Sequence, residues 1–505
     1  MSLRGRAWGG LAAGLWCLLI ASGAASAEVD QQSPRWKAWP SSRAPKALPA
    51  QDVKFPPYEV RTLPNGLRVV AVAQHEQPAV TLRLLVRAGA AQDPAGKAGL
   101  ATLTASLLDQ GTPTRTSEQI ADAIDYIGGA LGAGAGTDLS FINVVVMKDS
   151  FDSSLDLLSD LVRNASFAED EIARQRQQML STLQVSYEDP EYLAGTVIDR
   201  LVYGFHPYGV PSGGTRESIG SLTRDDIVRF HQHWFTPNNA ILAIVGDLTP
   251  QEAFAGAERA FGSWVGREVP AVRFPDPPPP TRRVVVVDRP GAVQTEIRIG
   301  NVAIPRKHSD YLALELAIRI LGGEGSNRLQ RVLRSERGLT YGASADLQAL
   351  KQTGGIVADT DTRSEATGQA LRLAVDEFWS LIREPVGEWE LSNAKAYMTG
   401  NFPLTLETPN AIALQVLNMV FYEIDLKELE TFRERVNAVT PDDIQRVARA
   451  YLQPNRLSIA LVGDARSIGP QLKSVGFEQF EQVLIDEFDP TAVDFKRAGR
   501  RVPIQ

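Results

Sequence analysis

The chain has 505 residues and a formal net charge of −8, and its basic residues are scattered rather than gathered in one stretch. This charge distribution argues against nucleic acid as a partner. The length exceeds what one compact core usually holds, so at least two domains are expected, and no segment after the N-terminal leader is apolar for long enough to span a bilayer.

The N-terminus has the pattern of a secretory signal peptide. Arg4 and Arg6 precede an apolar stretch that ends in the small residues Ala-Ser-Ala, the last of which is Ala27. We predict cleavage after residues 1–27 and export to the periplasm, with an uncleaved membrane anchor as the alternative. The single cysteine, Cys17, lies inside this leader. The mature chain is therefore predicted to have neither a disulfide nor a thiolate metal site.

Composition divides the rest of the chain. Residues 28–55 are rich in Pro, Ser, Ala and Gln and are predicted to form a flexible arm. The proline-rich residues 267–282 are predicted to form an extended linker. The linker separates a first domain, 56–266, from a second, 283–488. Residues 489–505 end in a basic, polar sequence that we predict to be a disordered tail.

The two halves repeat one pattern. Residues 222–248 align without a gap on residues 439–465. In both, Thr and a pair of Asp begin a helix, an aromatic residue precedes Pro-Asn at its end, and an apolar strand runs into Gly-Asp. Each half also opens with strand-like runs, at 67–74 and 80–89 in the first half and at 282–288 and 295–304 in the second, and helical patterns follow at 117–128 and 309–323. The predicted fold class is α+β, with two tandem homologous domains, each a mainly antiparallel sheet packed with helices.

Three segments carry a resemblance to a known family. They are GKAGLATLTASLLDQGT at 96–112, the segment from FHPYG to IVGD at 205–247, and LGGEGSNRLQRVLRSERGLTYG at 321–342. In this order, and with the duplication, they resemble the landmark segments of pitrilysin/insulinase-type metallopeptidases. The resemblance covers about residues 58–485. It implies domains of the LuxS/metallopeptidase-like type in a clam-shell arrangement around a peptide.

The zinc motif of the family is replaced in this sequence. Active members carry His-x-x-Glu-His on a helix, where the two histidines bind zinc and the glutamate polarises water. The matching positions here are Thr102, Ala105 and Ser106. The third family ligand, a glutamate, aligns with Thr182, and a supporting acidic position aligns with Gln175. Neutral hydroxyls are poor zinc ligands and alanine accepts no proton, so the site is predicted to be degenerate, with no metal or cofactor in this chain.

Other candidate metal ligands are few. The histidines are His75, His206, His231, His233 and His308. His231 and His233 are two residues apart on a predicted helix and face away from each other, so we interpret them as helix-surface residues. His206 lies in a loop signature of the family, which favours a structural role. The acidic run at 169–171 is typical of the first turn of a helix.

The second half keeps residues that the family uses. In LRSERGLTYG, Arg334 and Tyr341 match an arginine and a tyrosine that, by the resemblance, contact the substrate backbone and the developing oxyanion. The alternative is an arginine in a helix-surface ion pair and a half-buried strand tyrosine.

Two glycine-rich segments are open to two interpretations. Residues 321–329 lack the Gly-Lys-Ser/Thr ending of a P-loop. They resemble a glycine-rich loop that contributes to substrate handling in non-catalytic chains of related two-subunit peptidases, but a plain connecting loop fits equally. Residues 127–146 match the family's cavity-lining edge strand, which can pair with an extended peptide, or mark a flexible turn.

These observations favour a non-catalytic, substrate-binding subunit of a heteromeric zinc peptidase, inactive alone. Its partner would be a homologue that carries His-x-x-Glu-His and supplies zinc and the general base, while this chain supplies Arg334 and Tyr341 to the peptide substrate. The alternative is an inert scaffold of the same fold. A self-sufficient peptidase is disfavoured, because the sequence contains neither a Ser-His-Asp motif nor a Gly-x-Ser-x-Gly elbow.

Overall fold

A computed structural model describes residues 54–323 and 325–497. The predicted signal peptide, almost all of the predicted arm and the residues after 497 lie outside these ranges. Within them, no helix combines the length and the apolar character needed to cross a bilayer.

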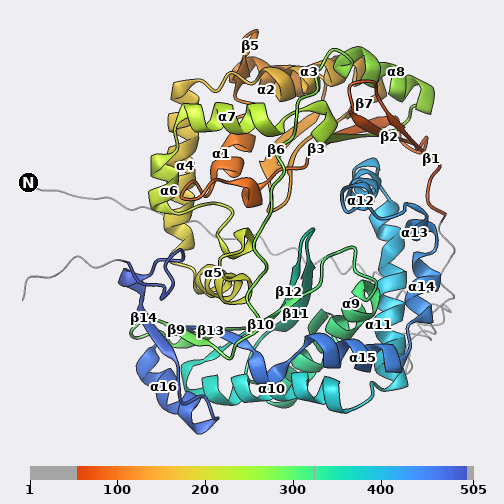
Figure 1. The fold of residues 1–505 in the computed structure, drawn as a ribbon. Helices are drawn as coiled ribbons and strands as arrows, with labels where there is room; N and C mark the ends of the chain where they lie inside the picture. The colour runs from red at the N-terminus through yellow and green to blue at the C-terminus, as the bar shows by residue number, and fades with distance from the viewer. Residues whose placement is uncertain (1–53, 324, 498–505) are drawn as a thin grey trace, which may run out of the picture. The chain divides into compact units, whose positions relative to one another are not determined.

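The described residues form two six-stranded sheets, one from each half of the chain (Figure 1). Across the first sheet the strands are β1 (Tyr58–Thr62), β2 (Arg68–Ala73), β8 (Ala240–Gly246), β3 (Ala79–Val86), β7 (Ser140–Met147) and β6 (Ala130–Ala135). Across the second they are β14 (Glu481–Leu484), β9 (Val284–Asp288), β13 (Ser458–Gly463), β10 (Gln294–Ala303), β12 (Gly354–Arg363) and β11 (Ala343–Ala349). Most neighbours are antiparallel, and the parallel pairs are β2–β8, β9–β13 and β9–β14. The predicted α+β class is confirmed.

Helices pack on both sheets. In the first half they are α1 (Leu100–Ser106), α2 (Ser117–Tyr126), α3 (Phe151–Asn164), α4 (Glu169–Ser186), α5 (Pro190–Tyr203), α6 (Arg216–Ser221), α7 (Arg224–Trp234) and α8 (Pro250–Phe261). In the second half they are α9 (Tyr311–Ile318), α10 (Thr367–Arg383), α11 (Glu388–Asn401), α12 (Pro409–Phe421), α13 (Lys427–Glu430), α14 (Phe432–Ala438), α15 (Pro441–Tyr451) and α16 (Ala465–Ser474). A two-stranded ribbon, β4 (Gly111–Thr112) and β5 (Arg115–Thr116), lies between α1 and α2.

The repeated segments have the same local chemistry. Thr223 begins α7 and Thr440 begins α15, and each hydroxyl accepts a hydrogen bond from the backbone N–H of an aspartate three residues later, at 3.2 Å. The aspartate side chain accepts the threonine N–H in return, which satisfies two backbone donors at the helix start. The strands that follow, β8 and β13, are buried along their whole length in the middle of each sheet.

Each half covers one face of the other half's sheet with a helix (Figure 1). α5, from the first half, packs against β10 and β13, and α12, from the second half, packs against β3 and β8. The α5 contact is close at Gly300, where a Cβ would lie 3.2 Å from a Val202 methyl carbon. Because burial of an apolar side chain contributes about 1.5–3 kcal/mol, these two exchanged helices are a large part of what holds the halves together.

The described part of the predicted tail differs from the expectation of disorder. Phe495 is fully buried, and it stacks with Phe488 at a ring distance of 6.3 Å in the cluster around α5. Backbone hydrogen bonds join Asp489 N–H to the Phe495 carbonyl and Arg497 N–H to the Glu487 carbonyl. The prediction of disorder rested on the basic and polar residues around Phe495 and overlooked that the phenylalanine side chain can be buried.

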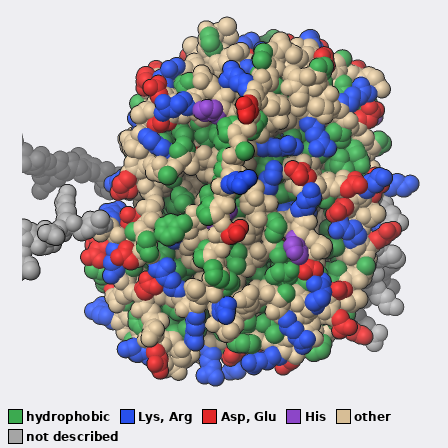
Figure 2. Space-filling view, viewed as in Figure 1, with side chains coloured by type: hydrophobic (Ala, Val, Ile, Leu, Met, Phe, Trp, Pro, Cys, Tyr) green, Lys and Arg blue, Asp and Glu red, His purple; other side chains and the backbone are tan. Residues whose placement is uncertain are grey.

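Charged side chains of both signs are mixed on the surface. On the face drawn in Figure 2, Lys and Arg are interspersed with Asp and Glu. Ion pairs join many charged side chains of the described residues, as in the contact of Arg259 with Asp152 and Asp156. This face has no basic field of the kind that binds nucleic acid.

The helix exchange predicts that a change in α12 is felt in the first sheet. Leu417 is fully buried in the cluster that α12 forms with β8, whereas Leu414, on the same helix, is 42% exposed. Leu417→Ala should lower the free energy of unfolding by about 2–5 kcal/mol and speed amide exchange in β8, while Leu414→Ala should do neither. Denaturant titration with hydrogen exchange measures both effects. If Leu417→Ala sped amide hydrogen exchange only in the second half, α12 would not stabilise the first sheet, and the prediction would be contradicted.

Candidate functional site

Helix α1, which carries the degenerate zinc motif, is held at its N-terminus by a carboxylate. Asp93 accepts hydrogen bonds from the backbone N–H groups of Gly99, Leu100 and Ala101 at 2.8, 3.1 and 2.8 Å. These donors have no partner within the helix, so the carboxylate satisfies them and complements the helix dipole. Gly99 has a φ of +91°, a conformation that favours glycine.

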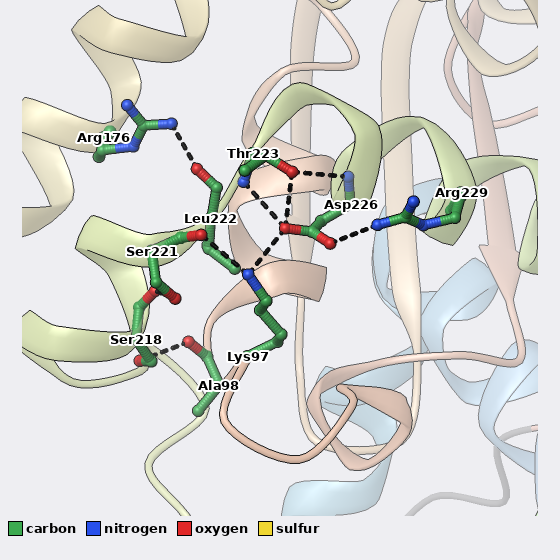
Figure 3. Close-up of polar contacts among 9 residues, drawn as sticks. All are labelled: Lys97, Ala98, Arg176, Ser218, Ser221, Leu222, Thr223, Asp226 and Arg229. Carbon is green, nitrogen blue, oxygen red and sulfur yellow. Dashed lines mark hydrogen bonds and ion pairs between the residues drawn. The ribbon is translucent and has the colours of Figure 1, made fainter.

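A polar network ties the start of α1 to its neighbours (Figure 3). Lys97 donates to the Ser221 carbonyl at 2.8 Å and forms an ion pair with Asp226 at 2.9 Å. Although burial opposes it, hydrogen bonds from Lys97 and Thr223 hold the pKa of Asp226 well below its usual range. From α4, Arg176 donates to the Leu222 carbonyl at 2.7 Å. The network therefore fixes α1, α4, α6 and α7 relative to one another.

The hydroxyls at the two histidine positions are engaged within the protein. Thr102 Oγ1 donates to the Ser212 carbonyl at 2.8 Å, and Ser106 Oγ donates to the Leu103 carbonyl of its own helix at 2.9 Å. Ala105, at the position of the general base, is fully buried. The helix is kept, but its reactive side chains are replaced by groups that satisfy the fold.

The third ligand position lies on a neighbouring helix. Thr182 is exposed on α4, which packs against α1, and Gln175 lies on the same helix. In the described ranges, no three His, Cys, Asp or Glu side chains are grouped so that they could hold a metal ion. The donor set at these positions does not fit zinc, because it consists of neutral hydroxyls that already donate hydrogen bonds and one exposed threonine. That the complex obtains its zinc from a partner remains a prediction.

The histidines have roles in packing. His206 is buried, and its Nδ1 accepts the Tyr208 N–H at 3.1 Å, in agreement with a structural role. The interpretation of His231 as a helix-surface residue is wrong. Its Nε2 donates to the Val162 carbonyl at 2.8 Å, its ring stacks on Phe235, and burial lowers its pKa to about 4. His231 therefore lies on the inward side of α7, together with the apolar residues of that helix.

Arg334 and Tyr341 are both exposed on the second half. Arg334 lies exposed on a π-helical turn, Gln330–Glu336, and forms no ion pair with the described residues. Tyr341 is 87% exposed in the loop before β11. The alternative of a paired arginine and a half-buried tyrosine is therefore wrong, and both side chains are available to another molecule.

A cavity of about 590 Å³ lies beside this segment. Its lining comes from the glycine-rich turn, from three strands of the second sheet, from α5 and from α11: Glu191, Glu296, Arg298, Gly322, Gly323, Gly325, Asn327, Gln330, Gly342, Ala343, Ser344, Asp359, Thr360, Asp361 and Tyr397. Gln330 and Gly342 flank Arg334 and Tyr341 in the chain. Neither Arg334 nor Tyr341 lines the cavity, and the degenerate zinc positions Thr102, Ala105, Ser106 and Thr182 do not line it either.

Acidic side chains surround one arginine in this cavity. Arg298 forms ion pairs with Glu191 at 3.0 Å, Glu296 at 3.2 Å and Asp359 at 3.5 Å. Burial raises the pKa of Glu296 to about 7, and the nearby carboxylates, Asp359 first, add to the effect of burial, which Arg298 opposes. The cavity therefore contains more carboxylates than the arginine can neutralise.

The two repeats differ in what surrounds this arginine. Arg83 pairs with Asn143 across β3 and β7 as Arg298 pairs with Asp359 across β10 and β12. In the first half, the guanidinium of Arg83 lies 4.8 Å from the centre of the Phe141 ring instead of among carboxylates. The arginine is common to both repeats and the acidic residues are not. Sequence reasoning missed the cavity, although the polar Glu-x-Arg within an otherwise apolar strand was a signal that one face of β10 is not core.

The structure is a two-repeat α+β chain in which Thr102, Ala105, Ser106 and Thr182 stand at the positions that the resemblance assigns to the zinc site. Residues 68–215 match the family Insulinase (Peptidase family M16), and residues 221–398 match the family Peptidase M16 inactive domain. The chain belongs to the peptidase M16, or insulinase, family.

Relatives and solved structures extend over most of the chain. An uncharacterized zinc protease of Mycobacterium bovis is 27% identical over 426 residues, which cover 82% of this chain and 95% of that protein. One of Bacillus subtilis is 22% identical, with 76% and 93% covered. A crystal structure of a peptidase M16 inactive domain from Pseudomonas fluorescens superposes with a TM-score of 0.77 at 27% identity, with 81% of this chain and 98% of that chain covered. A protease from Helicobacter pylori, 23% identical, has the same fold, with a TM-score of 0.77 and 81% of this chain and 100% of that chain covered.

The retained scaffold predicts that zinc binding can be restored by side chains alone. A chain with Thr102→His, Ala105→Glu, Ser106→His and Thr182→Glu should bind about one zinc ion, because α1 and α4 remain in contact. The wild-type chain should bind almost none. A matched control moves the last glutamate to the exposed neighbour, Ser181→Glu, and should bind zinc more weakly. Metal analysis after dialysis measures the number of zinc ions per chain. If the fourfold variant folds but binds no zinc, the two helices have lost the geometry of the family's zinc site.

Proposed function

We propose that this chain is a non-catalytic, substrate-binding subunit of a heteromeric zinc peptidase. Its partner is a homologue that carries His-x-x-Glu-His and contributes zinc and the general base. This chain contributes Arg334 and Tyr341 to the peptide and is inactive alone.

The observation that carries the proposal is the asymmetry between the two halves. In the first half, the hydroxyls of Thr102 and Ser106 donate hydrogen bonds to backbone carbonyls, so neither residue is available to activate water. In the second half, Arg334 and Tyr341 are exposed, and Arg334 forms no ion pair with the described residues. A guanidinium and a phenol are donors suited to a carbonyl oxygen that gains negative charge. Such donors have a use only if the rest of the catalytic site comes from elsewhere.

The names of the relatives agree with a divided peptidase. Relatives with similarity over most of the chain are named zinc proteases, while one matched solved structure is named an inactive domain and another a protease. The glycine-rich turn beside the 590 Å³ cavity supports a role in holding an extended peptide near Tyr341, because glycines let a backbone approach closely. The N-terminal sequence supports a periplasmic location for the complex.

The proposal predicts a loss of turnover when the exposed pair is changed in the complex. Arg334→Ala should lower the rate of peptide cleavage about 100-fold, and Tyr341→Phe about tenfold or more, because each removes a donor to the developing oxyanion. Arg331→Ala, an exposed arginine on the same turn, is the matched control and should leave the rate unchanged. Peptide cleavage by the co-purified pair with the partner's zinc content held constant measures the effect. Unchanged turnover in both variants would instead favour the inert scaffold.

A further inference from the structure

A second cavity, of about 350 Å³, lies among helices of the second half. It is formed between α9, the π-helical turn at Arg319, α11, α12, α13 and α14. Much of its wall is apolar: Phe402 and Phe432 stack at a ring distance of 4.6 Å, and Met398, Met419 and Leu429 lie beside them. A cavity of this size and character suits a single large apolar side chain.

The charges in this cavity leave one arginine without a counter-ion. Three arginines and two glutamates line it. Arg319 pairs with Glu315 at 2.8 Å, and Arg435 pairs with Glu428. Arg306 lies with its guanidinium 3.7 Å from the centre of the Tyr311 ring and forms no ion pair with the described residues. The cavity thus has an apolar wall and one excess positive charge.

We propose that this cavity binds the C-terminal residue of a peptide, with the terminal carboxylate on Arg306 and an apolar last side chain against Phe402 and Phe432. A guanidinium held over an aromatic ring is pre-oriented and binds a carboxylate through two parallel hydrogen bonds. The excess charge and the apolar wall together match this ligand and do not match a cationic or fully polar one.

The position of the cavity links it to the substrate. Tyr397 lines both this cavity and the 590 Å³ cavity beside the glycine-rich turn. A peptide in the first cavity that passes Tyr397 therefore brings its C-terminus to Arg306. This inference rests on the proposed function, since it takes the ligand to be a peptide substrate, but the binding it predicts is a property of the isolated chain.

The test measures binding of one fluorescein-labelled peptide that ends in phenylalanine, as the free acid and as the C-terminal amide. The wild-type chain should bind the acid about tenfold more tightly than the amide, because only the acid forms a charge-assisted pair with Arg306. Arg306→Gln should remove that difference by weakening the acid alone. Lys307→Gln is the matched control: its side chain is 61% exposed, lies next in the chain and pairs with Glu423 at 3.5 Å, so it should preserve the difference.

Several results would overturn the proposal. Equal affinities of acid and amide for the wild-type chain, or no saturable binding of either, would remove the carboxylate site. If Arg306→Gln weakened the binding of both peptides equally, Arg306 would have a structural role. If Lys307→Gln weakened the binding of the acid peptide as much as Arg306→Gln does, the binding would depend on general surface charge. Octanoate binding as tightly as the acid peptide would assign the cavity to small apolar acids. Absence of a zinc-bearing partner would defeat the proposed function but would not change these measurements.

Discussion

The fold depends on two helices, α5 and α12, each of which packs on the sheet of the other half of this duplicated chain. The face of each sheet that is not covered by its own helices contains apolar residues, and the helix that buries them comes from the other half. Val285, Val287 and Val462 meet α5, while Val70, Ile241 and Val245 meet α12. Each half therefore relies on a helix of the other half to bury this face of its sheet. α5 packs mainly against β10 and β13 and brings Glu191 to the cavity that β10, β11 and β12 line, so the same constraint places the acidic cavity.

Helix α1 is held in place by contacts outside the positions that match the zinc motif. In the family, zinc joins two helices through their side chains. Here the same elements are joined by the Asp93 carboxylate at the helix start, by Lys97 and Asp226, and by Arg176 from α4. These contacts use backbone groups and charged side chains beyond the five motif positions. The motif could therefore change to Thr, Ala and Ser without loss of the helix.

The sequence predicted the fold through features that are local. Thr223 and Thr440 cap helices because their hydroxyls meet nearby N–H groups, and the apolar strands after them form the sheet centres. The exchange of α5 and α12 was not predicted, because an amphipathic helix shows which face is buried but not which sheet buries it. Phe495 and His231 were misplaced because the contacts that hold them come from residues distant in the chain: the cluster around α5 buries Phe495, and the half-buried His231 donates to the Val162 carbonyl.

The candidate site was predicted only in part. The loss of the zinc ligands is visible in the sequence itself, and the exposure of Arg334 and Tyr341 agrees with the roles that the resemblance implies. The two cavities depend on tertiary packing: Glu191, Glu296 and Asp359 come together from α5, β10 and β12. In the other cavity, Glu315 and Glu428 pair with Arg319 and Arg435, and Arg306 forms no ion pair with the described residues. No spacing in the sequence encodes such a balance of partners.

We propose that this chain lacks a metal-dependent active site of its own and works through a partner. The most direct test measures bound zinc and peptide turnover for the isolated chain and for its mixture with a homologue that carries His-x-x-Glu-His. We expect neither zinc nor turnover in the isolated chain and both in the mixture, at a rate above that of the homologue alone. Chelator-sensitive peptide turnover by the isolated chain would contradict it.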